Sequence, residues 1–102
     1  MRYQLVLQFT ANTTDNFDPL IDLEGKLIEA LDSVAAIDGH DFGLSEFNIF
    51  ILTNEPAIAF DRARRVVRDQ KLQHCMRAAY RKSNGEKYVI LWPPTLNEFV
   101  IS

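Results

Sequence analysis

The chain has 102 residues, of which 47% are hydrophobic, and this is enough for one domain with a single core that needs neither a metal nor a disulfide. Eleven basic and fourteen acidic residues give a net charge of -3 and a pI near 5.2, and because an acidic surface repels phosphate backbones we expect no nucleic acid partner. The single cysteine, the lack of a signal peptide and the lack of an apolar run of roughly 20 residues predict a cytoplasmic protein with no membrane partner.

The N-terminal third of the chain predicts a strand followed by a helix. The strand shows apolar residues in alternation with polar ones, which is typical of a strand with one buried face: Tyr3, Leu5, Leu7 and Phe9. The polar residues 12–16 predict a loop. Asp18 before Pro19 predicts the start of a helix, and its apolar stripe continues to about Asp32.

The middle of the chain predicts a hairpin and a second helix. Residues 34–42 and 46–53 have the composition of strands, and the turn Gly43-Leu44-Ser45 joins them. Asn54 ahead of Pro56 predicts the start of the second helix, whose apolar stripe is clear. Its outer face carries three basic residues that we interpret as solvated: Arg62, Arg65 and Arg68.

The C-terminal third predicts a second hairpin and a tail. Residues 72–81 and 87–92 are predicted strands, and the turn between them contains Asn84-Gly85. This pair is typical of a type I′ turn, in which both central residues have positive φ. Two prolines then end the strand, so residues 95–102 are expected to form a short C-terminal tail.

The order of predicted elements is β-α-β-β-α-β-β, an α+β arrangement. Right-handed crossovers place the first and third strands at the centre of an antiparallel sheet with both helices on one face. The sequence therefore predicts a ferredoxin-like plait with one added strand beside the fourth strand. We expect residues 1–94 to form this single domain and residues 95–102 to form the tail.

Three segments resemble a group of small, stand-alone bacterial proteins of unassigned function that have the same βαββαβ fold. These segments are the run Asp38-Gly-His-Asp-Phe-Gly, the strand residues 48–53 and residues 88–93. The resemblance covers the second and third strands and the final hairpin. It implies the fold, and it implies no catalytic residue.

The sheet face opposite the helices is the first candidate site, because helices cover only one side of such a sheet. Alternation along the strands assigns to this face a set of polar, aromatic and basic residues: Gln4, Gln8, Asn48, Phe50, Arg77 and Arg81. One interpretation is a half-polar face covered in part by the tail or by a second copy of the chain in a homodimer. The other is a binding site in which Arg77 and Arg81 hold a carboxylate or phosphate beside Phe50. An RNA-recognition plait needs stacked aromatic residues on the central strands, and only Phe50 qualifies.

A group of ionisable residues around the second strand is the other candidate: Asp38, His40, Asp41 and Glu46. On a regular strand Asp38 and His40 share one face while Asp41 points to the other, so all four side chains converge only if Gly39 or Gly43 forms a bulge. Convergence would permit a divalent metal site or acid-base chemistry with His40 as the base. The alternative, which we favour, is an exposed edge strand protected by charges and glycine kinks. We therefore expect no metal and no cofactor.

The remaining reactive residues form no recognisable motif. His74 and Cys75 are neighbours on the predicted fourth strand, so they point to opposite faces and cannot form a thiolate-imidazole pair. Cys75 is expected on the face opposite the helices as a small packing residue. No phosphate-binding glycine loop, nucleophile elbow or metalloprotease motif is present.

Two function classes follow from these residues. The first, which we favour because convergent nucleophiles and bases are lacking, is a cytoplasmic binding module that recognises a protein partner or a small ligand through the open sheet face. Regulatory plaits and toxin-neutralising immunity proteins are of this kind. The second is a small enzyme resembling dimeric α+β barrels, in which two sheets enclose a cavity and His40 or His74 serves as base.

Overall fold

The computed structural model of the protein describes residues 1–10, 18–42 and 46–101. The predicted loop at residues 12–16 and the predicted turn at Gly43-Leu44-Ser45 lie outside the described residues. None of the described helices is long and apolar enough to cross a membrane.

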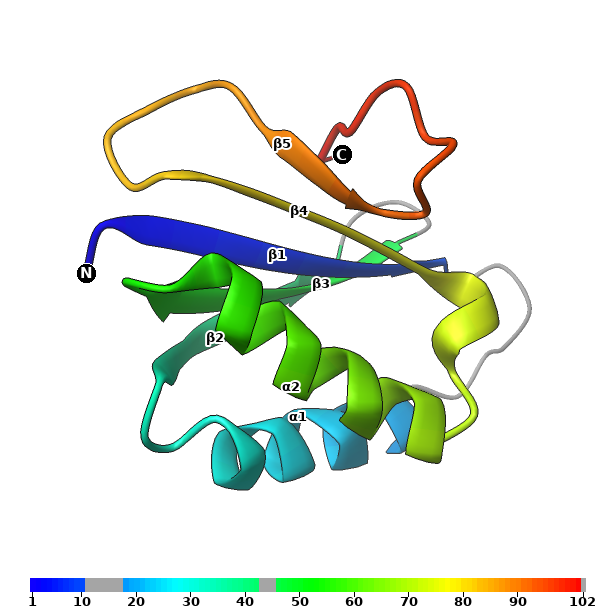
Figure 1. The fold of residues 1–102 in the computed structure, drawn as a ribbon. Helices are drawn as coiled ribbons and strands as arrows, with labels where there is room; N and C mark the ends of the chain where they lie inside the picture. Colours follow the sequence, from blue (N-terminus) through cyan, green and yellow to red (C-terminus); the bar gives the residue numbers. More distant parts are fainter. Residues whose placement is uncertain (11–17, 43–45, 102) are drawn as a thin grey trace.

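Two helices cover one face of a five-stranded antiparallel sheet (Figure 1). The elements follow in the order β1 (Tyr3–Thr10), α1 (Asp18–Ala30), β2 (Ala35–Phe42), β3 (Glu46–Thr53), α2 (Pro56–Asp69), the 3-10 turn η1 (Gln73–Cys75), β4 (Met76–Lys82) and β5 (Val89–Trp92). The spatial strand order is β2-β3-β1-β4-β5, and every neighbouring pair is antiparallel. The fold is therefore a ferredoxin-like plait with an added strand beside β4, which confirms the prediction.

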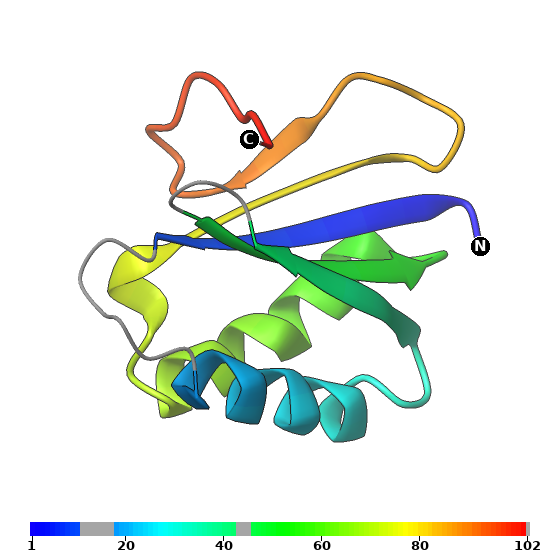
Figure 2. The ribbon, with the colours of Figure 1, turned by 180° about the vertical axis from the view of Figure 1, so that it is seen from behind.

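The main core lies between the sheet and the helices. Alternate residues of β1 point to this side, and Leu5, Leu7 and Phe9 are fully buried. The apolar stripes of both helices pack against them: Leu20, Leu23, Leu27 and Leu31 from α1, and Ala59, Phe60, Ala63 and Val67 from α2. The view from behind shows both helices on the same side of the sheet (Figure 2). The apolar stripes of both helices and the alternate apolar residues of β1 thus form one apolar layer.

The C-terminal tail lies on the opposite face of the sheet, next to β5 (Figure 1). There Val6, Ala79 and Phe99 form a second, smaller buried cluster. Partly buried apolar residues complete it: Phe50, Tyr88, Ile90, Leu96 and Ile101. The sequence left open whether the tail or a second copy covers this face, and in the structure the tail covers part of it.

The fourth strand begins later than the sequence predicts, at Met76 rather than Leu72. Helix α2 closes with a Schellman motif in which Lys71 has a φ of 61°. The amide of Lys71 donates to the carbonyl of Arg68, and that of Leu72 donates to the carbonyl of Val67, at 2.9 and 3.1 Å. The predicted strand start was wrong because residues 71–72 still satisfy the carbonyls of the helix.

Cys75 consequently does not reach the sheet face opposite the helices, which corrects its predicted place. It ends the short 3-10 turn η1, its thiol donates to the carbonyl of Leu72 at 3.2 Å, and it packs against the main core. His74, beside it in η1, is exposed.

The turn before β5 also differs from the predicted type I′ turn. The amide of Gly85 donates to the carbonyl of Lys82 at 2.9 Å, so the turn spans residues 82–85. Among the described residues only Lys71 and Gly39 have positive φ, so neither Asn84 nor Gly85 does. Arg81 supports this different turn, because its Nη1 donates to the carbonyls of Lys82, Ser83 and Gly85 at 3.1, 3.0 and 2.8 Å.

Candidate functional site

A row of polar residues crosses the sheet face opposite the helices. Gln8 of β1 lies opposite Asn48 of β3 on one side and opposite Arg77 of β4 on the other. Asn48 in turn lies opposite Asp41 of the edge strand β2. Because residues directly opposite in antiparallel strands place their side chains on the same face, the four side chains form one row across four strands. The row has an acidic end, two amides and a basic end.

The two amides at the centre of this row are buried and incompletely hydrogen-bonded. Gln8 and Asn48 are both 0% exposed. The Nε2 of Gln8 donates to the carbonyl of Val100 at 2.9 Å. Within the described part of the chain, the Oε1 of Gln8 and both polar side-chain atoms of Asn48 have no hydrogen-bond partner. A buried polar group without a partner costs about 1 to 3 kcal/mol of folding free energy, so the unpartnered atoms of this pair destabilise the fold.

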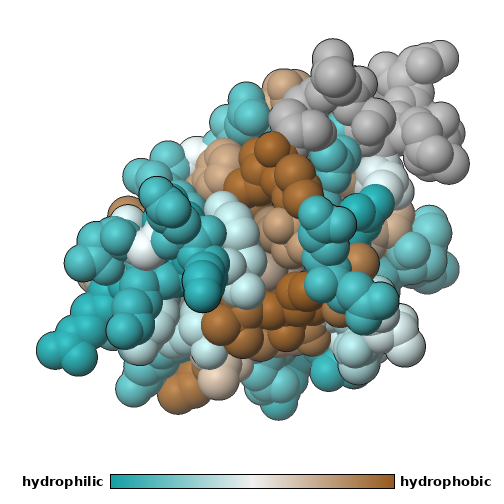
Figure 3. Space-filling view, turned by 90° about the horizontal axis from the view of Figure 1, so that it is seen from above, coloured by the Kyte–Doolittle hydropathy of each residue, from teal (hydrophilic) through white to brown (hydrophobic). Residues whose placement is uncertain are grey.

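An apolar row lies next to the polar one. Val6 lies opposite Phe50 and Ala79, and Ala79 lies opposite Ile90 of β5. Phe99 of the tail packs on this row, with its ring 5.0 Å from that of Tyr88. The space-filling view shows an apolar band with groups of hydrophilic side chains on both sides (Figure 3). The face therefore combines an apolar row with two side-chain amides that can form hydrogen bonds.

The tail is attached to this face mainly by side chains. Among the described residues, the bond from Gln8 to Val100 is the one hydrogen bond that joins residues 95–101 to the strands. The backbone amide of Leu96 bonds only within the tail region, to the carbonyl of Pro93 at 3.0 Å. Few polar contacts would therefore be lost if another segment took the place of the tail.

The predicted arginines differ in their availability. The Nη1 of Arg81 donates to the carbonyls of Lys82, Ser83 and Gly85, so Arg81 has a structural role in the turn after β4. Arg77 is half-buried beside Gln8, and no hydrogen bond or ion pair engages it among residues 1–10, 18–42 and 46–101. Gln4 lies opposite Leu52 and Arg81, toward the other end of β1, and is not part of the row that contains Gln8.

The second candidate cluster is not brought together. A register shift lies between Ile37 and Gly39, and Gly39 has a φ of 132°. This bulge places His40 opposite Ile49 on the helix side and Asp41 opposite Asn48 on the other side. Glu46 lies opposite Thr10 at the start of β3, and Asp38 is exposed in the bulge. In the described part of the chain no three His, Cys, Asp or Glu side chains gather as metal ligands would.

His40 instead pairs with a helix residue that sequence reasoning missed. Its Nδ1 lies 3.0 Å from both carboxylate oxygens of Glu24 on α1. The imidazole stacks on Phe47, with centroids 5.2 Å apart, and meets the edge of Phe42 at 5.5 Å. Glu24 and His40 are 16 residues apart on different elements, so no local spacing reveals the pair. Neither His40 nor His74 lies on the sheet face opposite the helices.

Comparison with protein-family models, with curated proteins and with solved structures gives no significant match. Functional roles for this chain therefore rest on the geometry of its own residues.

Proposed function

We propose that the protein is a cytoplasmic binding module that recognises an extended segment of a protein partner on the sheet face opposite its helices. One observation carries this proposal, namely the pair of fully buried amides, Gln8 and Asn48, with three side-chain atoms that have no partner in the described structure. Buried polar groups in native proteins are almost always satisfied, and exceptions point to a missing partner or to a functional requirement.

An extended polypeptide suits these amides better than a purely apolar surface does. A peptide backbone offers an N–H donor and a C=O acceptor at each residue, and Asn48 offers one acceptor and one donor group in return. The carbonyl of Val100 already accepts from Gln8 in this way. A partner strand in the same place would extend that pattern to Asn48 and recover part of the free energy lost by its burial.

The tail indicates which side chains the face accepts. Phe99 and Ile101 pack against the second cluster, whereas Val100 between them is 55% exposed. This is the period of two expected of an extended segment. We therefore expect the partner segment to carry apolar residues at alternate positions and to compete with residues 95–101. Arg77 and Asp41, at the two ends of the polar row, would favour one orientation of a charged partner.

The alternative of a small enzyme with a histidine base finds less support in the geometry. Such a barrel would enclose the sheet face opposite the helices, and a base would have to lie on that face. His40 is on the helix side with Glu24, and His74 is in η1.

Selection of displayed random peptides on the full-length Phe99→Ala variant tests the proposal, because this variant weakens the tail as a competitor. Selected peptides should share apolar residues at alternate positions. Their affinity should fall by about tenfold or more when Asn48→Leu is added, the loss expected when one or two buried hydrogen bonds are removed. Ile28→Ala, at an exposed position of α1, is the control and should leave affinity unchanged. Peptides that keep full affinity for the Asn48→Leu variant would contradict the proposal, as would a selection that enriches none.

A further inference from the structure

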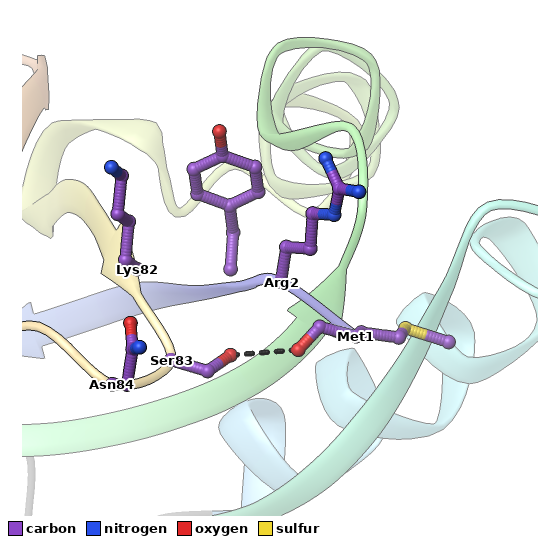
Figure 4. Close-up of a pocket in the computed structure, with 6 residues that line it drawn as sticks. Met1, Arg2, Lys82, Ser83 and Asn84 are labelled. Carbon is purple, nitrogen blue, oxygen red and sulfur yellow. Dashed lines mark hydrogen bonds between the residues drawn. The ribbon is translucent and has the colours of Figure 1, made fainter.

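A second site, separate from the amide pair, lies where β1 begins and β4 ends. Two neighbouring pockets of about 450 and 390 Å³ meet there and share Tyr3 and Lys82. The first is also lined by Arg2, Ser83 and Asn84, and Figure 4 shows it in close-up. Tyr3 is five residues before Gln8 on β1, so this pocket lies toward the opposite end of the strand from the polar row.

Hydrogen bonds fix the backbone that carries the lining residues. The amide of Ser83 donates to the carbonyl of Arg2 at 2.8 Å, and its hydroxyl donates to the carbonyl of Met1 at 2.9 Å (Figure 4). On the other side, the amide of Arg2 donates to the Oδ1 of Asn54 at 2.9 Å. The start of β1 is thus held between the turn after β4 and the end of β3. A rim fixed in this way loses little entropy when a ligand binds.

The charges around the pockets are unbalanced. Arg2, Arg81, Lys82 and Lys87 contribute four cations, against one carboxylate, that of Glu86. Arg81 donates to the carbonyls of the turn after β4. No ion pair or hydrogen bond to the side chains of Arg2, Lys82 and Lys87 is found among the described residues, in a chain whose net charge is -3. The side chains of Arg2 and Lys82 extend to the same side of the strands (Figure 4). Cations held near one another repel, and an anion between them removes that repulsion and gains charge-assisted hydrogen bonds.

An aromatic wall borders the cations. The rings of Tyr3 and Tyr80 meet edge to face at 5.7 Å, and Val89, which also lines the second pocket, is 50% exposed. The hydroxyl of Tyr3 has no hydrogen-bond partner in the part of the chain that the structure describes, so it remains available as a donor. A flat apolar group would cover this wall while its charged substituent reached Arg2 and Lys82.

We propose that this double pocket binds a small phosphomonoester whose phosphate is joined to a planar apolar group. A phosphate monoester carries close to two negative charges at neutral pH and so matches several unpaired cations better than a single carboxylate does. The planar group packs against Tyr3, Tyr80 and Val89. This site is independent of the binding proposed for the sheet face opposite the helices, because it uses none of the residues of the polar row.

Titration of the full-length protein with phenyl phosphate, followed by backbone amide shifts, tests this proposal. We expect saturable shifts around Tyr3 and Lys82, and binding at least about tenfold weaker for inorganic phosphate and for phenol, since each lacks one half of the recognised group. The double variant Arg2→Gln, Lys82→Gln should lose at least about tenfold in affinity. Tyr3→Phe should lose a smaller factor, because it removes one donor and keeps the ring.

A matched control separates a site from a general charge effect. The double variant Lys26→Gln, Arg68→Gln removes the same charge from the two helices and should bind phenyl phosphate within about twofold of the wild type. Equal losses in both double variants would overturn the proposal, as would shifts that do not saturate or that do not centre on Tyr3. The Asn48→Leu variant should bind phenyl phosphate normally, so a failure here and a failure of the sheet-face proposal give different results.

Discussion

His40 of the edge strand β2 and Glu24 of helix α1 lie in direct contact, with the Nδ1 of His40 3.0 Å from both carboxylate oxygens of Glu24. The contact ties the outermost strand to the helical layer. It follows from the bulge at residues 37–39, because the bulge turns the imidazole to the helix side. The same imidazole packs against Phe47 and Phe42, so its apolar and polar contacts can be separated by mutation.

We expect His40→Ala to lower the free energy of unfolding by about 1 to 2 kcal/mol, mostly through lost ring contacts. Glu24→Ala should lower it by less than about 1 kcal/mol, because the pair is partly exposed and its Coulomb energy is screened. Urea denaturation of both variants measures the difference. If Glu24→Ala were the more damaging of the two, the contact with Glu24 and not the aromatic packing would be the larger source of stability at this position.

Replacing an unsatisfied buried amide should stabilise the domain. Asn48→Leu removes two polar atoms that have no partner among the described residues and fills the same space with apolar atoms. The free energy of unfolding should rise by about 1 to 3 kcal/mol.

Thr53 is the matched control for this substitution, because it is also fully buried but has its hydrogen bonds. Its hydroxyl donates to the carbonyl of Val34 and accepts from the amide of Glu55, both at 2.9 Å. Thr53→Val should therefore lower stability by about 1 to 3 kcal/mol. A destabilised Asn48→Leu variant would mean that Asn48 is satisfied in solution and would remove the main argument for a binding face.

Two glycines provide a paired test of the bulge in β2. Gly39 has a φ of 132°, where a side chain is strained, although a Cβ there meets no atom within 4 Å. Gly39→Ala should lower stability by about 1 to 3 kcal/mol through the backbone alone. Gly25 lies in α1 with equally open surroundings, and Gly25→Ala should raise stability by up to about 1 kcal/mol. Equal thermal shifts for the two variants would show that the bulge is absent in solution.

The thiol of Cys75 should react slowly. Burial raises the pKa of the Cys75 thiol above its ordinary range, and a backbone hydrogen bond offsets part of this effect. Iodoacetamide should modify the folded protein more slowly than the urea-unfolded chain at the same pH, because less thiolate is present. Faster modification of the folded protein would contradict this pKa direction.

The raised pKa also makes the stability of the protein depend on pH, because the folded state favours the neutral thiol of Cys75. The contribution of Cys75 to stability is complete below the pKa of the unfolded thiol and is lost as the pH rises through the raised folded value. A change to alkaline buffer should therefore lower the melting temperature of the wild type more than that of the Cys75→Ala variant.

The fold follows from sequence patterns that depend on near neighbours. The alternation of Leu5, Leu7 and Phe9 identifies β1 and its buried face, and the helical stripes identify the core sides of α1 and α2. The start of β4 was not predictable in this way. It depends on the carbonyls of Val67 and Arg68 accepting from the residues after the helix, and a propensity for strand at Leu72 does not reveal that.

The members of the polar row were predictable only in part, because Gln4 and Arg81 lie outside it and Asp41, which joins it, was assigned to the other cluster. Alternation assigns Gln8 and Asn48 to the face opposite the helices, and the strand register agrees. The complete burial of both side chains is a tertiary effect, and the tail bonded to Gln8 through the carbonyl of Val100 lies 92 positions away in the sequence. The separation of His40 from Asp41 likewise depends on a bulge whose position, but not whose effect, is indicated by Gly39.

The most direct test of the proposed binding face uses the tail itself as the ligand. A synthetic peptide of residues 95–102 is titrated into the isotope-labelled, full-length Phe99→Ala variant, and the side-chain amide signals of Gln8 and Asn48 are followed, with a scrambled peptide as control. We predict saturable shifts of both signals in this variant, and binding at least about tenfold weaker to the wild type, whose own tail competes at high effective concentration. A folded Phe99→Ala variant whose Gln8 and Asn48 signals do not respond to the peptide would contradict the account.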